Sequence, residues 1–174
     1  MGYVTDKDTL FDHDYSFSGE VLAPVSLHHY EATGRSYIAN IPFNQIVGVS
    51  NGNYFNLSWG SILRERRLQH PMRTLEGLAE NPSYYLDSQP KQGLNAAKIG
   101  GRYYITGGVH RMIIGRAFME YNDLPAELRG VHVTEYVKPN LKVEDIFGEP
   151  EKPKQNFNWV WVAVAAIAAY LLLT

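Results

Sequence analysis

The chain has 174 residues, a formal net charge of −2 and a pI of about 6.3, and it contains no cysteine. That length is sufficient for one domain with a sizeable hydrophobic core. The slightly negative charge excludes a global positive field that would attract nucleic acid, so any contact with DNA must be local. The lack of cysteine excludes disulfides, thiolate metal sites and a cysteine nucleophile.

The first part of the chain is predicted to be an irregular segment followed by short strands. Residues 1–20 mix acidic and aromatic side chains without a clear period, and we expect them to be irregular. Strand composition predicts short strands at 21–25, 36–41 and 45–49. These strands would open a domain that extends over residues 21–138.

Two helices are expected next, and they carry the densest basic group of the sequence. Apolar residues fall at helical spacing from Ser58 to Leu68, and a second helix should begin near Pro71 and end before Asn81. Four arginines of this region could contact the phosphates of DNA or of a nucleotide, although a solvated helix face explains such a group more simply. They are Arg64, Arg66, Arg67 and Arg73.

The segment 94–137 has the clearest pattern in the chain. Strands are predicted at 94–99 and 102–106, joined by a two-residue glycine turn. A helix should follow over 109–121, and the alternation of 131–137 predicts a further strand. This strand-helix-strand unit places a glycine loop at the start of a helix, which is where α/β domains place ligands.

The residues of that loop have the chemistry of a phosphate-binding site. First-turn N–H groups have no partner within the helix, and glycine lets a phosphate approach the backbone closely. Arginine supplies a bidentate fork, and histidine supplies a donor whose charge changes near neutrality. A glycine pair that merely ends the hairpin is the simpler alternative. The predicted phosphate-binding residues are Thr106, Gly107, Gly108, Val109, His110 and Arg111.

Metal ligands are not evident in the sequence. Hydrolysis of a phosphoanhydride or phosphodiester commonly needs a metal held by carboxylates. The glutamates of the helical regions are explained more simply as solvated helix faces. The acidic and histidine clusters near the N-terminus give only a weak signal for metal binding. These residues are Glu65, Glu76, Glu80 and Glu120, with Asp12-His13-Asp14 and His28-His29.

Positions 100–118, GGRYYITGGVHRMIIGRAF, resemble the ParB/sulfiredoxin superfamily. In that family a strand runs into a Gly-x-x-Arg or Gly-x-His-Arg loop, and the following helix carries small residues such as alanine. The resemblance covers about residues 36–137 and is specific over 94–121. It implies an α/β (α+β) fold with a mixed sheet and flanking helices.

The resemblance also implies a function for the glycine loop. The loop would hold the phosphates of ATP or CTP, with Mg²⁺ as an accompanying ion, and His110 and Arg111 would be the catalytic residues. Val109 stands where sulfiredoxins have their reactive cysteine, which excludes peroxiredoxin repair. The chain also lacks the helix-turn-helix domain of chromosome-partition members, so specific centromere binding is not expected.

The C-terminal part is predicted to be a linker at 139–156 and a transmembrane helix at 157–174. Residues 159–173 are unbroken apolar, and a helix over 157–174 would be about 27 Å long, slightly short of a hydrocarbon core of about 30 Å. Lys152 and Lys154 precede it and favour a domain on the cytoplasmic side of the inner membrane. The alternative is a C-terminal helix packed on the domain, which would leave a soluble domain of unknown purpose.

These features lead to two function hypotheses. The first is a membrane-tethered nucleotide-binding protein with ATPase or DNase activity, similar in layout to small plasmid-encoded members of the superfamily that inhibit conjugative transfer. Its partners would be a nucleotide, the membrane, DNA and a conjugation-channel protein. The second is an interaction protein of the same fold that has no catalytic activity and blocks a membrane partner.

Overall fold

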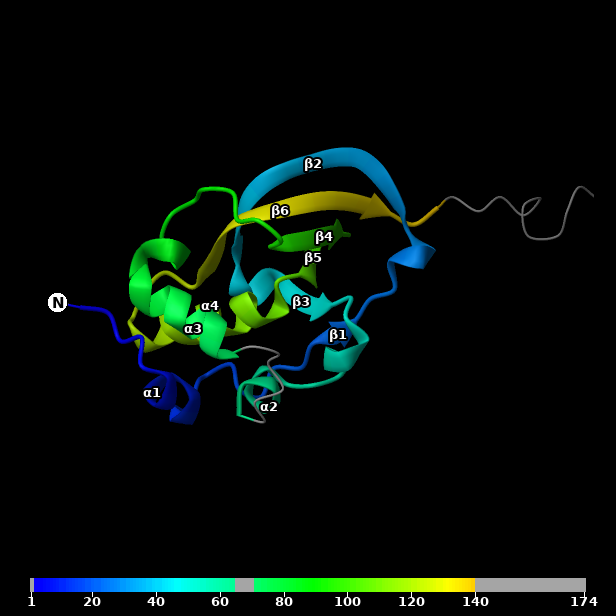
Figure 1. The fold of residues 1–174 in the computed structure, drawn as a ribbon. Coiled ribbons are helices and arrows are strands. Elements are labelled where there is room, and N and C mark those ends of the chain that lie inside the picture. The colour runs from blue at the N-terminus through cyan, green and yellow to red at the C-terminus, as the bar shows by residue number, and fades with distance from the viewer. Residues whose placement is uncertain (1, 65–70, 140–174) are drawn as a thin grey trace, which may run out of the picture. The chain divides into compact units, whose positions relative to one another are not determined.

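A six-stranded mixed sheet forms the framework of the protein (Figure 1). The structure is a computed structural model, and it describes residues 2–64 and 71–139. The strands follow the order β1-β3-β5-β4-β6-β2 across the sheet. Their bounds are Ala23–Pro24 for β1, Glu31–Pro42 for β2, Ile46–Val49 for β3, Asn95–Ile99 for β4, Arg102–Gly107 for β5 and Glu127–Val137 for β6.

The sheet combines parallel and antiparallel pairs. Strand β3 runs parallel to both β1 and β5, whereas β4 is antiparallel to β5 and parallel to β6, and β6 is antiparallel to β2. The mixed sheet and its helices confirm the α+β class. Strands β5 and β6 of the predicted strand-helix-strand unit are not neighbours, because β4 lies between them.

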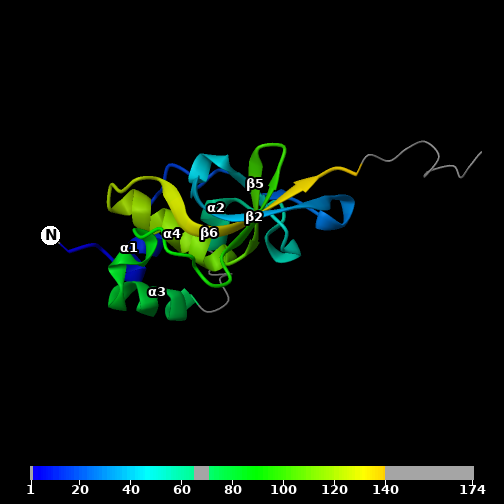
Figure 2. The same cartoon turned by 90° about the horizontal axis from the view of Figure 1, so that it is seen from above.

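The four α-helices of the described residues lie below β2 and β6 in the view of Figure 1. They are α1 (Lys7–Asp12), α2 (Trp59–Arg64), α3 (Pro71–Glu80) and α4 (Val109–Tyr121), and short 3₁₀ turns accompany them as η1 (Leu27–His29), η2 (Phe43–Gln45), η3 (Gly52–Tyr54) and η4 (Pro82–Tyr85). Helix α4 lies between β6 and α3, as the view in Figure 2 shows. It is buried along nearly its whole length, so its N-terminus is held in a fixed place.

The predicted hairpin, the two helices that begin at Pro71 and Val109, and their ends are confirmed. Gly100 and Gly101 form the turn between β4 and β5 with φ of 56° and 82°, which is the left-handed backbone that such turns require. Strands β2 and β6 are longer than their sequence patterns predicted. They pair with each other from Glu31↔Val137 to Pro42↔Glu127, so the ladder extends both strands beyond their apolar cores.

The prediction that residues 1–20 are irregular is wrong for Lys7–Asp12, which form α1. Asp6 caps this helix by accepting a hydrogen bond from the Thr9 N–H. Leu10 and Phe17 are fully buried in the main core. A helix of six residues is too short to show a period in the sequence, and its stability comes from packing on the rest of the domain.

An ion pair between the buried Arg116 and the exposed Glu20 ties this N-terminal segment to α4. The guanidinium of Arg116 donates to both carboxylate oxygens of Glu20 at 2.6 and 2.7 Å. It lies 4.3 Å from the ring centroid of Phe17 and 4.5 Å from that of Trp59. Cation–π contacts with these two rings and the bidentate carboxylate together compensate for the burial of this charge.

The described residues contain no helix that is both long enough and apolar enough to span a bilayer. The linker beyond Pro139 and the membrane anchor predicted for 157–174 lie outside the described residues. The same holds for the side chains of Arg66, Arg67 and Arg73. These assignments stay predictions.

Candidate functional site

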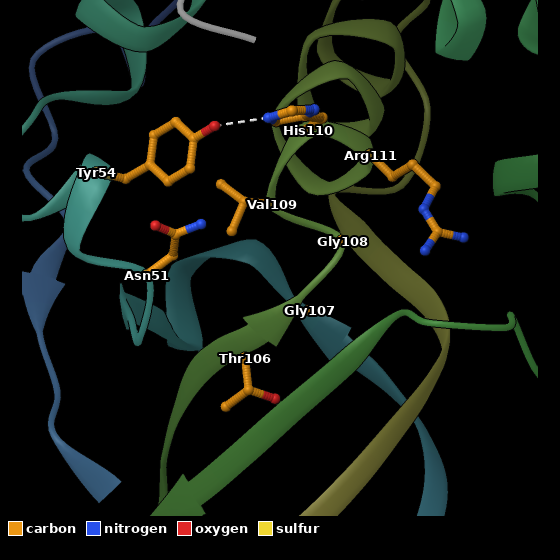
Figure 3. Close-up of a pocket in the computed structure, with 8 residues that line it drawn as sticks. All are labelled: Asn51, Tyr54, Thr106, Gly107, Gly108, Val109, His110 and Arg111. Atoms are coloured by element: carbon orange, nitrogen blue, oxygen red, sulfur yellow. Dashed lines mark hydrogen bonds between the residues drawn. The ribbon is translucent and has the colours of Figure 1, made fainter. Parts of the chain in front are cut away.

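A pocket of about 270 Å³ lies where two parallel strands end side by side (Figure 3). Strands β3 and β5 are neighbours with the same direction, so the loops that follow them meet at one edge of the sheet. The loop after β3 brings residues that the sequence analysis did not select, and the loop after β5 leads into α4. The lining residues are Asn51, Tyr54, Thr106, Gly107, Gly108, Val109, His110 and Arg111. All six residues predicted from the sequence as a phosphate-binding loop therefore line one pocket.

Gly108 is the N-cap of α4, and its position leaves no room for a side chain. Its φ of +78° lies in the left-handed region, and no side chain caps the helix. A Cβ atom at Gly108 would lie 2.9 Å from Cδ1 of Leu94 and 3.0 Å from the carbonyl oxygen of Gly93. The glycine thus permits both the turn and the close approach of the 93–94 segment. The first N–H groups of α4 face this edge with the positive end of the helix dipole.

His110 is fixed by a tyrosine from the other loop. Its Nε2 atom lies 2.6 Å from the hydroxyl of Tyr54, and the two rings meet edge to face with centroids 5.9 Å apart. Tyr54 is buried, and this burial raises the pKa of its phenol, so the phenol is neutral at physiological pH. The hydroxyl therefore holds the imidazole of His110 in one orientation beside the pocket. In that place the imidazole can donate or accept a proton.

Arg111 is anchored on the other side of α4. Its Nη1 atom donates to the carbonyl oxygen of Gln92 at 2.7 Å and to the hydroxyl of Tyr84 at 3.1 Å. Figure 3 shows its side chain directed away from Tyr54 and His110. The guanidinium still lies next to the glycine loop, because a Cβ at Gly108 would be 3.3 Å from Nη2. The structure thus places the two predicted catalytic side chains at opposite flanks of the helix N-terminus.

Asn51 supplies a donor that sequence reasoning missed. Its Oδ1 atom accepts a hydrogen bond from the N–H of Asn53 at 3.0 Å, which assigns the amide orientation and leaves the Nδ2 group for the pocket. The sequence indicated a turn at 50–53 but gave no sign that this turn lies opposite the glycine loop. That proximity depends on the pairing of β3 with β5, which no local pattern encodes.

The pocket offers hydrogen-bond donors and no carboxylate. Its lining contains three amide or hydroxyl side chains, an imidazole, a guanidinium and backbone N–H groups, but neither Asp nor Glu. Within residues 2–64 and 71–139, no group of three or more His, Asp or Glu side chains could hold a metal ion. This arrangement fits an anion such as a phosphate, and it does not fit a metal held by the protein.

The remaining predicted contacts lie away from the pocket. Arg64 pairs with the exposed carboxylate of Asp14 at 2.5 Å on the surface. Glu120 accepts hydrogen bonds from the backbone N–H and hydroxyl of Ser16, so it serves the packing of the N-terminal segment. His13 packs its ring against Tyr15 and Tyr121.

Comparison with known proteins adds no family to this description. No protein-family model, no curated protein and no solved structure matches the chain.

Proposed function

We propose that the protein binds a nucleotide through its phosphates at the pocket on the N-terminus of α4. The observation that carries this proposal is the convergence of two loops on one pocket whose lining is rich in donors and free of carboxylates. Backbone N–H groups at a helix N-terminus, next to a guanidinium and an amide, form a favourable environment for phosphate oxygens. The resemblance of positions 100–118 to the ParB/sulfiredoxin superfamily supports ATP or CTP as the nucleotide.

In this proposal each pocket residue has a separate task. The Gly107-Gly108 backbone and the first turn of α4 hold the phosphate, and the Asn51 amide contacts it from the opposite loop. Arg111 neutralises charge from its flank, and His110 is oriented by Tyr54 to transfer a proton. Hydrolysis of a nucleotide or of DNA would use these groups for charge stabilisation and proton transfer.

A second candidate function is phosphate or nucleotide binding without catalysis. One specific observation favours it. The lining of the pocket has no carboxylate that could hold Mg²⁺ or orient a water. In that case the protein would act by binding and blocking a partner, for example a component of a conjugation channel. For both candidates we propose that residues 157–174 anchor the protein in the inner membrane with the domain on the cytoplasmic side.

Calorimetric titration of the full chain with ATP and with CTP tests the binding proposal. We expect Arg111→Ala to weaken binding by about 10- to 100-fold, since charge-assisted hydrogen bonds contribute about 1.5–3 kcal/mol. Arg64→Ala is the matched control, because it removes an exposed arginine that lies outside the pocket. Thermal unfolding of each variant checks that the loop at Gln92 keeps its fold.

Two results would distinguish the candidates. ATPase or nuclease activity that disappears in Arg111→Ala supports the enzyme, whereas nucleotide binding without turnover supports the interaction protein. Equal affinity of wild type and Arg111→Ala for both nucleotides would remove the site assignment.

A further inference from the structure

The sheet has a second face, opposite to the one that packs on the main hydrophobic core. Ala96, Ile105 and Val133 are paired across β4, β5 and β6 and are buried in the core on the helix side. Because side chains alternate along a strand, the residues between them point to the opposite face. We call this opposite surface the open face, and its large side chains are Ile38, Ile99, Arg102, Tyr104, His132 and Tyr136.

Tyr104 is the large aromatic side chain of β5 on the open face and has small neighbours on both adjacent strands. Its strand partners are Gly48 on β3 and Ala97 on β4, and the next residue across the sheet is Thr134 on β6. A Cβ at Gly48 would lie 2.9 Å from Cδ1 of Tyr104, so the ring reaches across the neighbouring strand where the glycine leaves room. Gly48 has no side chain and Ala97 only a methyl group, and Tyr104 is half-buried.

A second ring lies at a distance suited to a separate contact. Tyr136 is two residues beyond Thr134 on β6, and β6 is separated from β5 by one strand. With strands about 4.8 Å apart and about 3.4 Å per residue, the Cα atoms of Tyr104 and Tyr136 are about 12 Å apart. His132 occupies the corresponding position on the other side of Thr134 and is exposed.

The charge of the open face is weakly positive. Among the stretches 95–99, 102–107 and 132–136 the one acidic residue is Glu135, and its alternation places it on the helix side. There it accepts hydrogen bonds from Tyr37 and Lys98. The open face itself keeps the exposed guanidinium of Arg102. On such a surface, bases can stack on the aromatic rings and phosphates can contact the cation, with no carboxylate to repel them.

We propose that the open face binds single-stranded nucleic acid, with one base stacked on Tyr104 and another on Tyr136. The binding is independent of sequence, because every base has an aromatic face, and Arg102 contacts a phosphate between the stacked bases. The weak charge of the face means a shallow salt dependence and a modest affinity. Thr106, which alternation places on the same face of β5 as Tyr104, lines the pocket at the N-terminus of α4, so the open face adjoins that pocket.

Fluorescence anisotropy of a labelled oligothymidine of about ten nucleotides, titrated with the full chain, tests the proposal. An oligouridine of equal length and the corresponding DNA duplex form the comparison arms. We expect both single strands to bind and the duplex to bind more weakly. Tyr104→Ala should weaken single-strand binding by about five- to one hundred-fold, and Tyr104→Phe should restore it because stacking needs the ring and not the hydroxyl.

Tyr3→Ala is the matched control, since this tyrosine is exposed on the N-terminal segment and lies outside the sheet. Its affinity for the oligonucleotide should equal that of wild type. The proposal is overturned if no single strand binds, if the duplex binds more tightly, or if folded Tyr104→Ala binds as well as wild type. A concentration-dependent dimer that Tyr104→Ala abolishes would also overturn it and would assign the open face to a second copy of the chain.

Discussion

Replacement of Gly108 by alanine tests the glycine requirement at the start of α4. Its φ of +78° places an alanine in the left-handed region, which costs about 1–2 kcal/mol. The new Cβ would also lie 2.9 Å from Leu94 and 3.0 Å from the Gly93 carbonyl, and crowding of this kind costs about 1–3 kcal/mol. We therefore expect Gly108→Ala to lower the free energy of unfolding by about 2–5 kcal/mol.

Gly101→Ala separates the two contributions. Gly101 has a φ of +82°, close to that of Gly108, but nothing lies within 4 Å of its would-be Cβ. This variant should lose only the backbone part, about 1–2 kcal/mol. Urea unfolding of both variants at equal m-values gives the difference directly. Equal losses in the two variants would refute the claim that the 93–94 segment closes on Gly108.

Three further predictions concern single polar contacts. Glu20→Gln should destabilise the fold by about 1–3 kcal/mol in urea unfolding, because the buried guanidinium of Arg116 loses its charged partner; an unchanged midpoint would contradict this. Tyr54→Phe should shift the ring ¹⁵N resonances of the histidine at the start of α4, and identical spectra would show that the 2.6 Å hydrogen bond does not form in solution. The hydrogen bond from Lys91 lowers the pKa of Asp87 below its usual 3.8, so the stability from this pair is present above that value and is lost as the pH falls through the lower, folded-state pKa. Acid titration of unfolding should therefore be flatter below pH of about 4 in Asp87→Asn, and parallel curves would refute the assignment.

The local elements of the site could be predicted because their signals are contained in short stretches. Gly100 and Gly101 mark a hairpin turn, and the apolar spacing from Val109 marks a helix directly after the glycine loop. Both follow from backbone conformation and side-chain periodicity over a few residues. The structure accordingly confirms the hairpin, the helix and the position of the loop between them.

Other parts of the candidate site depend on pairings between distant segments. Asn51 and Tyr54 face the loop only because β3 pairs with β5, although about fifty residues of sequence separate the two strands. The anchoring of Arg111 by Gln92 and Tyr84 likewise depends on how η4 packs beside α4. Such contacts have no periodic signature, because strand order is decided by the competition of whole packing arrangements.

By itself, the amino-acid sequence determined the hairpin turn at Gly100 and Gly101, the starts of α3 and α4, and which residues form the glycine loop. Tertiary structure alone decided that this loop meets a second loop and that its histidine and arginine lie on opposite flanks. The physical reason is the range of the interactions involved. Glycine conformation and helix periodicity act within a few residues, whereas burial and strand pairing join segments that are far apart along the chain.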